Sequence, residues 1–374
     1  MCVLALVATL AITACAAGGV GGPARATSDE PEAYRTEDAV AASFDQLPTP
    51  VPTPEPHYAK LRVFVASETT NQVWVMDGVP GQPFEVVGKI PVGSLPHQMG
   101  TSPDGKWIAV NNRMGNSTSI IDPLTKTEVV RIGVGKQPHG ITWSPDARTL
   151  FVGHERDTYI ARIEAGTWKL LSPLVVGVPQ HVLTIPNGHP NELWFTLTNT
   201  SQADVLRVYD LATDKITNIK VNDVHDAYFT PDESEVWSSS SGFLQRPSDR
   251  MVIYDPATKT VKTEIHFPGH YPFHTMKPNQ DGVFFMSDTS LMVLSDHLGP
   301  GLLWVDWKER RIVGETRLGQ QPFHTTYDPE GGRLLVTTNV DGMVNVIDIK
   351  TRALVQKIPV PRPHGIGSVP IPAS

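Results

Sequence analysis

Short runs of apolar and β-branched residues alternate with turns rich in Pro, Asp and Gly along most of the chain, and almost no stretch has the period of a helix. One unit begins at residues 96–100, turns at residues 102–105, and continues through the β-prone runs 107–110, 119–122 and 128–132. Four short strands joined by such turns are typical of one blade of a β-propeller. The pattern therefore predicts an all-β fold built from four-stranded blades.

The starts of the first strands predict the number of blades. They lie 40 to 50 residues apart, at His97, His139, His181, His225, His274, His324 and His364. Only one strand follows the last start, at residues 365–370, whereas residues 61–92 contain three strands without a first one. We expect the C-terminal strand to join the N-terminal blade and close the ring, which removes exposed sheet edges. Residues 59–374 are thus predicted to form a seven-bladed β-propeller.

The residues before the repeats predict export. Residues 3–14 are almost purely apolar, too few to span a bilayer, and suited to the core of a signal peptide. They end in Ile12-Thr13-Ala14-Cys15, which resembles the lipobox of bacterial lipoproteins, although no Lys or Arg precedes the run. The resemblance implies a signal peptide over residues 1–15 and a lipid on Cys15; the alternative is ordinary secretion.

Residues 16–58 are interpreted as a flexible tether, because alternating prolines near their end favour extended polyproline II. We expect a protein attached by its lipid to the periplasmic or extracellular face of the cell envelope, with no other contact to the membrane.

The repeats resemble the YVTN family of β-propellers over about residues 60 to 370. The resemblance is carried by Pro138-His139-Gly140, by the turn Ser102-Pro103-Asp104-Gly105, and by strand ends such as Ile121-Asp122. It implies the propeller fold and little about function, because this scaffold supports many activities.

Composition restricts the chemistry. The net charge of -8 argues against a nucleic-acid partner, because phosphate binding needs a basic patch. Both cysteines, Cys2 and Cys15, precede the repeats, so the folded body can form no disulfide, thiolate metal site or cysteine nucleophile. No nucleophile elbow or phosphate-binding loop is present either, and the sequence identifies no catalytic residue.

The histidines are the strongest functional signal. The chain has 13, and seven of them stand at the starts of the first strands listed above. Because first strands line the central channel of a propeller, these histidines are expected to form one ring at a channel mouth. Neutral imidazole is the commonest metal ligand, and a set without thiolate suits Cu, Zn, Ni or Fe. The alternative is a water-filled channel lined by histidines that bind no metal.

Side chains at the ends of the second strands are expected to support this ring. These ends carry Glu68, Asn112, Glu155 beside His154, Asn199, Asp288 and Asn339. Such groups can accept an imidazole N–H and fix its tautomer, although Asn and Asp also simply favour turns. Asp226, Met99 and Met276 are weaker candidates. The two thioethers would favour copper if they face the channel; the alternative is that both methionines fill the core.

The ring is similar to the copper-cluster propeller domain of nitrous oxide reductase, in which seven histidines hold several copper ions. The segment Gln321-Pro322-Phe323-His324-Thr325-Thr326-Tyr327-Asp328 carries this resemblance. The chain departs from that enzyme because it has no adjacent histidine pair and no cysteine-bearing electron-entry domain. Propellers that bind d1-type haem through one histidine are a second comparison, and lactonase propellers, which depend on carboxylates, are a third.

Three hypotheses remain open. The first is an exported metal-binding propeller, with copper predicted and another transition metal as the alternative. It would have a metal-handling role, or act as a copper-dependent oxidoreductase supplied by an external electron-transfer protein. The second is a non-enzymatic binding or scaffold propeller on the cell surface. The third is a propeller that binds a tetrapyrrole such as d1-type haem.

Overall fold

The computed structural model describes residues 58–197, 205–220, 224–239, 248–271, 273–278, 283–288 and 301–372. Cys15, the tether up to residue 57, and Asn199 lie outside these residues. For His274, Met276 and Asp288 the structure describes the strand but not the side chain.

The described residues form 28 strands in seven four-stranded antiparallel sheets. Six sheets use consecutive strands. The first three are β4 (Pro96–Thr101), β5 (Ile108–Asn112), β6 (Ser117–Asp122) and β7 (Thr127–Gly133); β8 (Pro138–Trp143), β9 (Thr149–His154), β10 (Tyr159–Glu164) and β11 (Leu170–Val175); and β12 (Gln180–Thr184), β13 (Glu192–Leu197), β14 (Val205–Asp210) and β15 (Lys215–Lys220). The next three are β16 (Asp226–Phe229), β17 (Val236–Ser239), β18 (Ser248–Asp255) and β19 (Thr260–Tyr271); β20 (Phe273–Pro278), β21 (Val283–Asp288), β22 (Gly301–Asp306) and β23 (Arg311–Arg317); and β24 (Pro322–Asp328), β25 (Arg333–Thr338), β26 (Met343–Asp348) and β27 (Leu354–Pro359). The seventh sheet has the order β28 (Pro363–Ile371), β1 (Lys60–Ser67), β2 (Gln72–Gly78) and β3 (Phe84–Pro91).

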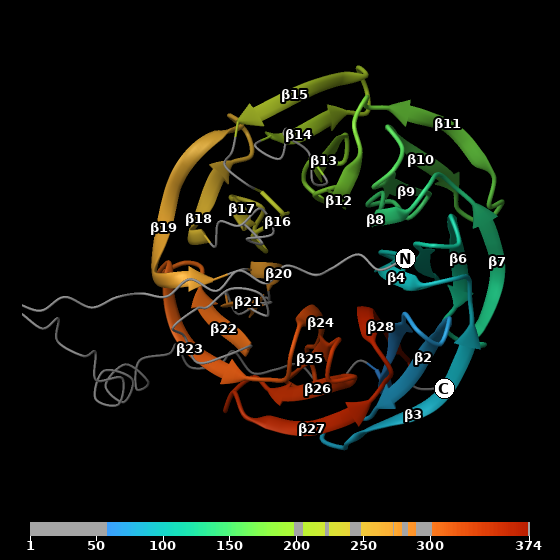
Figure 1. Ribbon diagram of the computed structural model, residues 1–374, viewed down its shortest axis with the longest axis vertical. Helices are drawn as coiled ribbons and strands as arrows, with labels where there is room; N and C mark the ends of the chain where they lie inside the picture. The colour runs from blue at the N-terminus through green and yellow to red at the C-terminus, as the bar shows by residue number, and fades with distance from the viewer. Residues whose placement is uncertain are drawn as a thin grey trace, which may run out of the picture. The chain divides into compact units, whose positions relative to one another are not determined.

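Figure 1 shows the sheets around a common centre, with the first strand of each sheet innermost and the fourth outermost. Burial follows this arrangement: β5 is buried at every position, whereas β7 exposes alternate residues. Neighbouring sheets pack face to face, as where Ile120 of one sheet meets Trp143 and Val152 of the next. The predicted all-β propeller with four-stranded blades is confirmed. No helix in the described part of the chain is long and apolar enough to cross a membrane.

Strand β28 joins the two ends of the propeller. It pairs antiparallel with β1, from Lys60 opposite Ile371 to Ser67 opposite Pro363. On its other sides it contacts the first strands β24 and β4 of the neighbouring sheets. Residues from the far C-terminus therefore lie beside the first blade-forming residues of the chain.

A buried ion pair on the sheet before it is hydrogen-bonded to this terminal sheet. Arg333 on β25 binds Asp328 through Nε and Nη2, at 2.9 and 2.7 Å, and also donates to the backbone carbonyls of Val79 and Gln82. Tyr58 donates a hydrogen bond to the same Asp328 carboxylate. Because these donors and acceptors come from both ends of the propeller, the contact holds the two sheets together.

Candidate functional site

A repeated backbone turn positions the side chains around the centre. In four sheets the residue just before the first-strand proline has a positive φ, at Leu95, Gln137, Gln321 and Arg362 (φ 55°, 51°, 55° and 44°). The carbonyl of each accepts a backbone hydrogen bond from the residue after the second strand: from Arg113, Glu155, Asn339 and Glu68, at 2.9, 3.0, 2.9 and 3.1 Å. Glu68, Arg113, Glu155 and Asn339 therefore occupy equivalent positions.

Six histidines form a continuous series of ring contacts, which we call the histidine arc. Its members in spatial order are His324, His364, His97, His139, His181 and His225. The distances between successive ring centroids are 4.7, 3.5, 4.9, 3.9 and 4.4 Å, and the pairs His364–His97 and His139–His181 are stacked. The seven-membered ring stays a prediction, because the side chain of His274 is outside the described set.

The arc is buried rather than spread along an open wall. His139 and His364 are each 3% exposed, and His97 is 8% exposed. Successive imidazoles of the arc are thus in direct contact with one another.

Glu68 supports His97, in the interior of the arc. Its Oε1 lies 2.7 Å from Nδ1 of His97, and its Oε2 accepts a hydrogen bond of 3.1 Å from the amide of Asn339. Asn339 also donates to the carbonyl of Pro363, next to His364. The predicted support of the histidines by Glu68 is thus direct, whereas Asn339 acts through Glu68.

Glu155 supports His181, the neighbour of His225 in the arc. Its Oε1 lies 3.4 Å from Nδ1 of His181, while its Oε2 accepts from Nε and Nη2 of Arg113 at 2.7 and 2.5 Å. His139 stacks on His181 and places its Nδ1 at 2.9 Å from the carbonyl of His181. In each case the carboxylate reaches the histidine of the following sheet, not that of its own sheet.

His225 completes the arc. Its Nε2 lies 2.9 Å from Nε2 of His181, and its Nδ1 lies 2.9 Å from Oδ1 of the buried Asp226. The described residues thus contain three triads of two histidines and one carboxylate whose donor atoms lie within 4.8 Å of one another. They are Glu68–His97–His364, His139–Glu155–His181 and His181–His225–Asp226.

Burial keeps the central histidines neutral. Loss of hydration holds the pKa of His97 and His181 well below 6.5, and the neighbouring His139 lowers both further. Burial also lowers the pKa of His139. Neutral imidazoles have a lone pair for a metal ion, which a protonated imidazole has lost.

The two supporting carboxyl groups differ. Burial raises the pKa of Glu68, against smaller opposing effects from Asn339 and two arginines. Burial also disfavours the charged form of Glu155, but the hydrogen bond to His181 and the positive charge of Arg113 outweigh it and hold its pKa far below the usual range. Glu155 is therefore an anion whose one oxygen is already bound by a guanidinium.

The strand register corrects the position of one histidine. Pro96 pairs with Asn112 at the end of β5, and Pro322 pairs with Thr338 at the end of β25. Phe323 therefore occupies the position of His97, and His324 lies one residue further along. The sequence pattern aligned Phe323-His324 with Pro96-His97; aligning the prolines Pro96, Pro138, Pro322 and Pro363 would have revealed the shift.

His324 nevertheless contacts its neighbour His364 in the arc. Its Nε2 accepts a hydrogen bond of 3.1 Å from the amide of Gln98, which occupies the corresponding position on β4. The ring of Phe323 lies 4.6 Å from that of His364.

Other candidates have different roles. The amide of Asn112 donates to Ser117 and Ser119 of its own sheet, so it does not touch a histidine through that group. Met99 packs in an apolar cluster with Ile108 and Val369. This packing favours the alternative that Met99 is a core residue over the hypothesis that it supplies a thioether to the site.

The sequence did not predict Arg113 as a site residue, because Asn112, one residue earlier, was chosen as the supporting group at the end of this strand. The signal was present: His154-Glu155 and Asn112-Arg113 align residue for residue. His154, by contrast, is fully engaged outside the arc, since its Nδ1 lies 2.9 Å from the carbonyl of Tyr159 and its Nε2 accepts from the N–H of Gly135 at 2.9 Å.

Two glycines allow the first strands to approach so closely. A Cβ on Gly365 would lie 2.2 Å from the carbonyl oxygen of His97, and a Cβ on Gly140 would lie 2.6 Å from that of His181. In His364-Gly365 and His139-Gly140, the histidine supplies an imidazole, and the glycine that follows lets the first strand of the next sheet approach the backbone closely. This contact brings the stacked imidazole pairs together.

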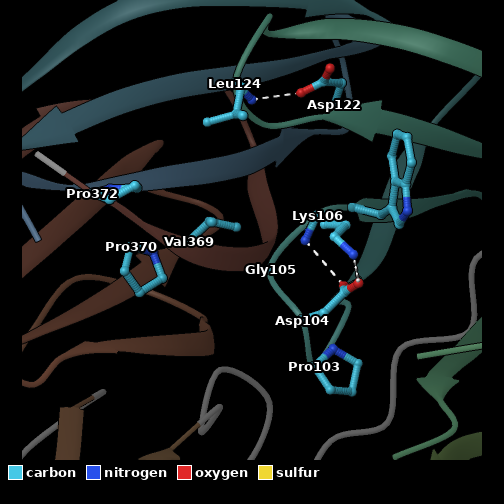
Figure 2. Close-up of a pocket in the computed structure, with 10 residues that line it drawn as sticks. Pro103, Asp104, Gly105, Lys106, Asp122, Leu124, Val369, Pro370 and Pro372 are labelled. Atoms are coloured by element: carbon cyan, nitrogen blue, oxygen red, sulfur yellow. Dashed lines mark hydrogen bonds and ion pairs between the residues drawn. The ribbon is translucent and has the colours of Figure 1, made fainter. Parts of the chain in front are cut away.

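A pocket of about 560 Å³ lies at the other ends of β4 and β28 (Figure 2). Its walls include Trp107, Leu124 and Pro370, with Asp104 and Lys106 hydrogen-bonded to each other at one side. His97 and His364 stand at the starts of these two strands, so the pocket and the arc belong to opposite faces of the propeller.

No protein-family model matches the sequence, and no curated protein matches it. Among solved structures, the periplasmic gluconolactonase PpgL of Pseudomonas aeruginosa is similar at 15% identity and a TM-score of 0.67, covering 84% of this chain and 100% of that one. Hydrazine synthase of Kuenenia stuttgartiensis is similar at 15% identity and a TM-score of 0.62, covering 72% and 88%.

The dihydro-haem d1 dehydrogenase NirN, solved in complex with DHE, is similar at 16% identity and a TM-score of 0.59, covering 87% of this chain and 78% of that one. At these identities the likenesses show the propeller fold and nothing about the activity. The resemblance to the YVTN family stays a prediction.

Proposed function

We propose that this protein binds first-row transition-metal ions through the histidine arc. The observation that supports the proposal is the set of three triads, each with two histidines and one carboxylate whose donor atoms lie within 4.8 Å of one another. The donors fit a metal ion, because burial keeps three of the imidazoles neutral and two hydrogen-bonded carboxylates are oriented towards them.

Copper is the ion that we expect to bind most tightly, because Cu²⁺ has the highest affinity among divalent first-row ions for nitrogen and oxygen donors. The mixed set of histidines and carboxylates also suits Zn²⁺ and Fe²⁺. The expectation of copper therefore rests on its higher affinity for these donors and not on a thioether ligand. In the bound state the ion would supply Lewis acidity or electron transfer, and the latter would require an external electron-transfer protein.

The test is metal analysis of the full-length protein without a histidine tag, after equilibration with equal concentrations of Cu²⁺, Zn²⁺ and Co²⁺. We expect stoichiometric metal, with copper in excess, and a lower metal content in the His181→Gln variant. His154→Gln is the control: this histidine is fully buried but bonded to backbone, so the variant should keep its metal while losing stability. A wild-type protein without stoichiometric metal would contradict the proposal and favour the scaffold hypothesis.

A tetrapyrrole is the second candidate, favoured by the structural likeness to NirN, whose structure contains DHE. One exposed axial histidine would be enough for such a ligand, whereas the described histidines are mostly buried against one another. A strong visible absorption band after incubation with a d1-type haem, lost in an arc variant, would favour this candidate over metal ions.

We also infer that the seven sheets are the blades of one closed ring. The support is the cyclic set of contacts between first strands, from β28 to β4, β8, β12, β16, β20, β24 and back to β28, together with the pairing of β28 with β1. Export and a lipid on Cys15 remain proposals from the N-terminal sequence; metabolic labelling with a fatty acid, compared between wild type and Cys15→Ser, tests them.

A further inference from the structure

Resting on the proposed metal binding, we propose that the histidine arc holds two separate ions and that the triad Glu68–His97–His364 keeps positions open for a small anion. We call Glu68–His97–His364 the isolated triad, because it shares no residue with the others. The triads His139–Glu155–His181 and His181–His225–Asp226 are the linked triads, because both contain His181.

Arg113 separates the two centres. It occupies the position equivalent to Glu68 and Glu155, since its N–H makes the same backbone hydrogen bond to Leu95 that theirs make in the other sheets. The guanidinium of Arg113 therefore occupies the position at which a third carboxylate would have been a ligand shared between His97 and His139. It binds Oε2 of Glu155 and leaves Oε1 directed towards His181.

The linked triads can hold one ion at a time. His181 directs Nδ1 towards Glu155 and Nε2 towards His225. A neutral imidazole has only one nitrogen with a free lone pair, so only one of the two triads can use His181 at once. An ion bound in one linked triad can also be coordinated by the histidine and carboxylate of the other, which fills its coordination positions.

The isolated triad has fewer donors. Two histidines and one carboxylate make three protein ligands, the number that leaves a position for water or substrate in catalytic metal sites. The neighbouring imidazole of His324 is one residue out of register, and its Nε2 accepts the amide proton of Gln98. A ligand from solution must therefore complete this centre.

Charge favours an anion as that ligand. The positive charges of Arg113 and Arg362 both act on Glu68. Arg362 is exposed and lies two residues before His364, close enough for its charge to act on Glu68. A divalent ion and two guanidinium groups outweigh the two carboxylates, Glu68 and the Glu155 that binds Arg113, and this net positive field attracts small anions from solution.

The experiment uses Co²⁺ as a visible probe and azide as the small anion. For the full-length protein we expect two bound cobalt ions, and an azide-induced change of the visible spectrum that saturates at one azide per protein. Glu68→Gln should retain one cobalt and lose the azide response, whereas Glu155→Gln should retain one cobalt with the response intact. Glu128→Gln, which removes a surface carboxylate paired with Arg131, is the control and should match wild type.

Arg362→Gln covers the case in which Glu68→Gln does not fold. Glutamine occupies the equivalent positive-φ position at Gln137 and Gln321, so the backbone should accept it. This variant should keep two cobalt ions and bind azide roughly threefold to fivefold more weakly, the effect of one partly screened surface charge.

The outcomes separate the two proposals. No bound cobalt would overturn metal binding altogether. One cobalt in wild type, lost in both Glu68→Gln and Glu155→Gln, would leave metal binding intact but replace the two centres with one. An azide response that persists in Glu68→Gln would overturn the assignment of the open position to the isolated triad.

Discussion

Replacing Gly365 with alanine tests how closely β28 approaches β4. The added Cβ would lie 2.2 Å from the carbonyl oxygen of His97 and 3.1 Å from the backbone nitrogen of Met99. An ordinary contact is about 3.4 Å or longer, so the two strands must separate by roughly 1 Å. Both obstructing atoms belong to the backbone, and no side-chain rotation can relieve the overlap.

Overpacking of this kind costs about 1–3 kcal/mol, and we expect the upper half of that range because the backbone must move. Gly133→Ala on β7 is the matched control: nothing lies within 4 Å of its Cβ, so its free energy of unfolding should change by less than about 0.5 kcal/mol. The assay is urea unfolding followed by tryptophan fluorescence. Equal unfolding midpoints for the two variants would refute the close approach on which the stacked pair His97–His364 depends.

Two further predictions concern stability. Burial lowers the pKa of His97, His139 and His181, so between pH 7.5 and 5.5 the unfolded chain takes up protons that the folded protein does not. The free energy of unfolding should therefore fall with decreasing pH, by up to about 1.4 kcal/mol per pH unit for each histidine. A free energy of unfolding that does not change with pH in urea titrations would contradict this. Arg333→Ala breaks the buried ion pair with Asp328 and the hydrogen bonds to the terminal sheet, and should cost about 3–5 kcal/mol. Arg148→Ala, whose side chain is 84% exposed, should cost less than about 0.5 kcal/mol; thermal unfolding compares the two.

The four-stranded blade was predictable because its signals are local. The turn at Ser102 and Asp104 recurs at Ser144 and Asp146 with the same hydrogen bonds, in which the serine donates to the aspartate and accepts the N–H five residues on. Turn chemistry of this kind is written into consecutive residues, and a repeat makes it visible several times.

The partners of the histidines were only partly predictable. Which carboxylate meets which histidine depends on contacts between sheets: Glu68 is 29 residues from His97 in sequence, and Asn339 is 271 residues from Glu68. The sequence pattern placed each supporting group beside the histidine of its own blade, whereas the turn directs it to the next. The shift of His324 was missed for a different reason, because the register depends on the proline and not on the histidine.

The pairing of β28 with β1 also sets an order of events for the site. Glu68 and His97 are among the first residues of the propeller to be synthesised, and His364 is among the last. The isolated triad therefore cannot form on a nascent chain or on one truncated before His364, and a metal ion bound there would report that both ends of the propeller have met. Metal capture at this centre would thus act as a final fold check, favouring proteins whose two ends have met.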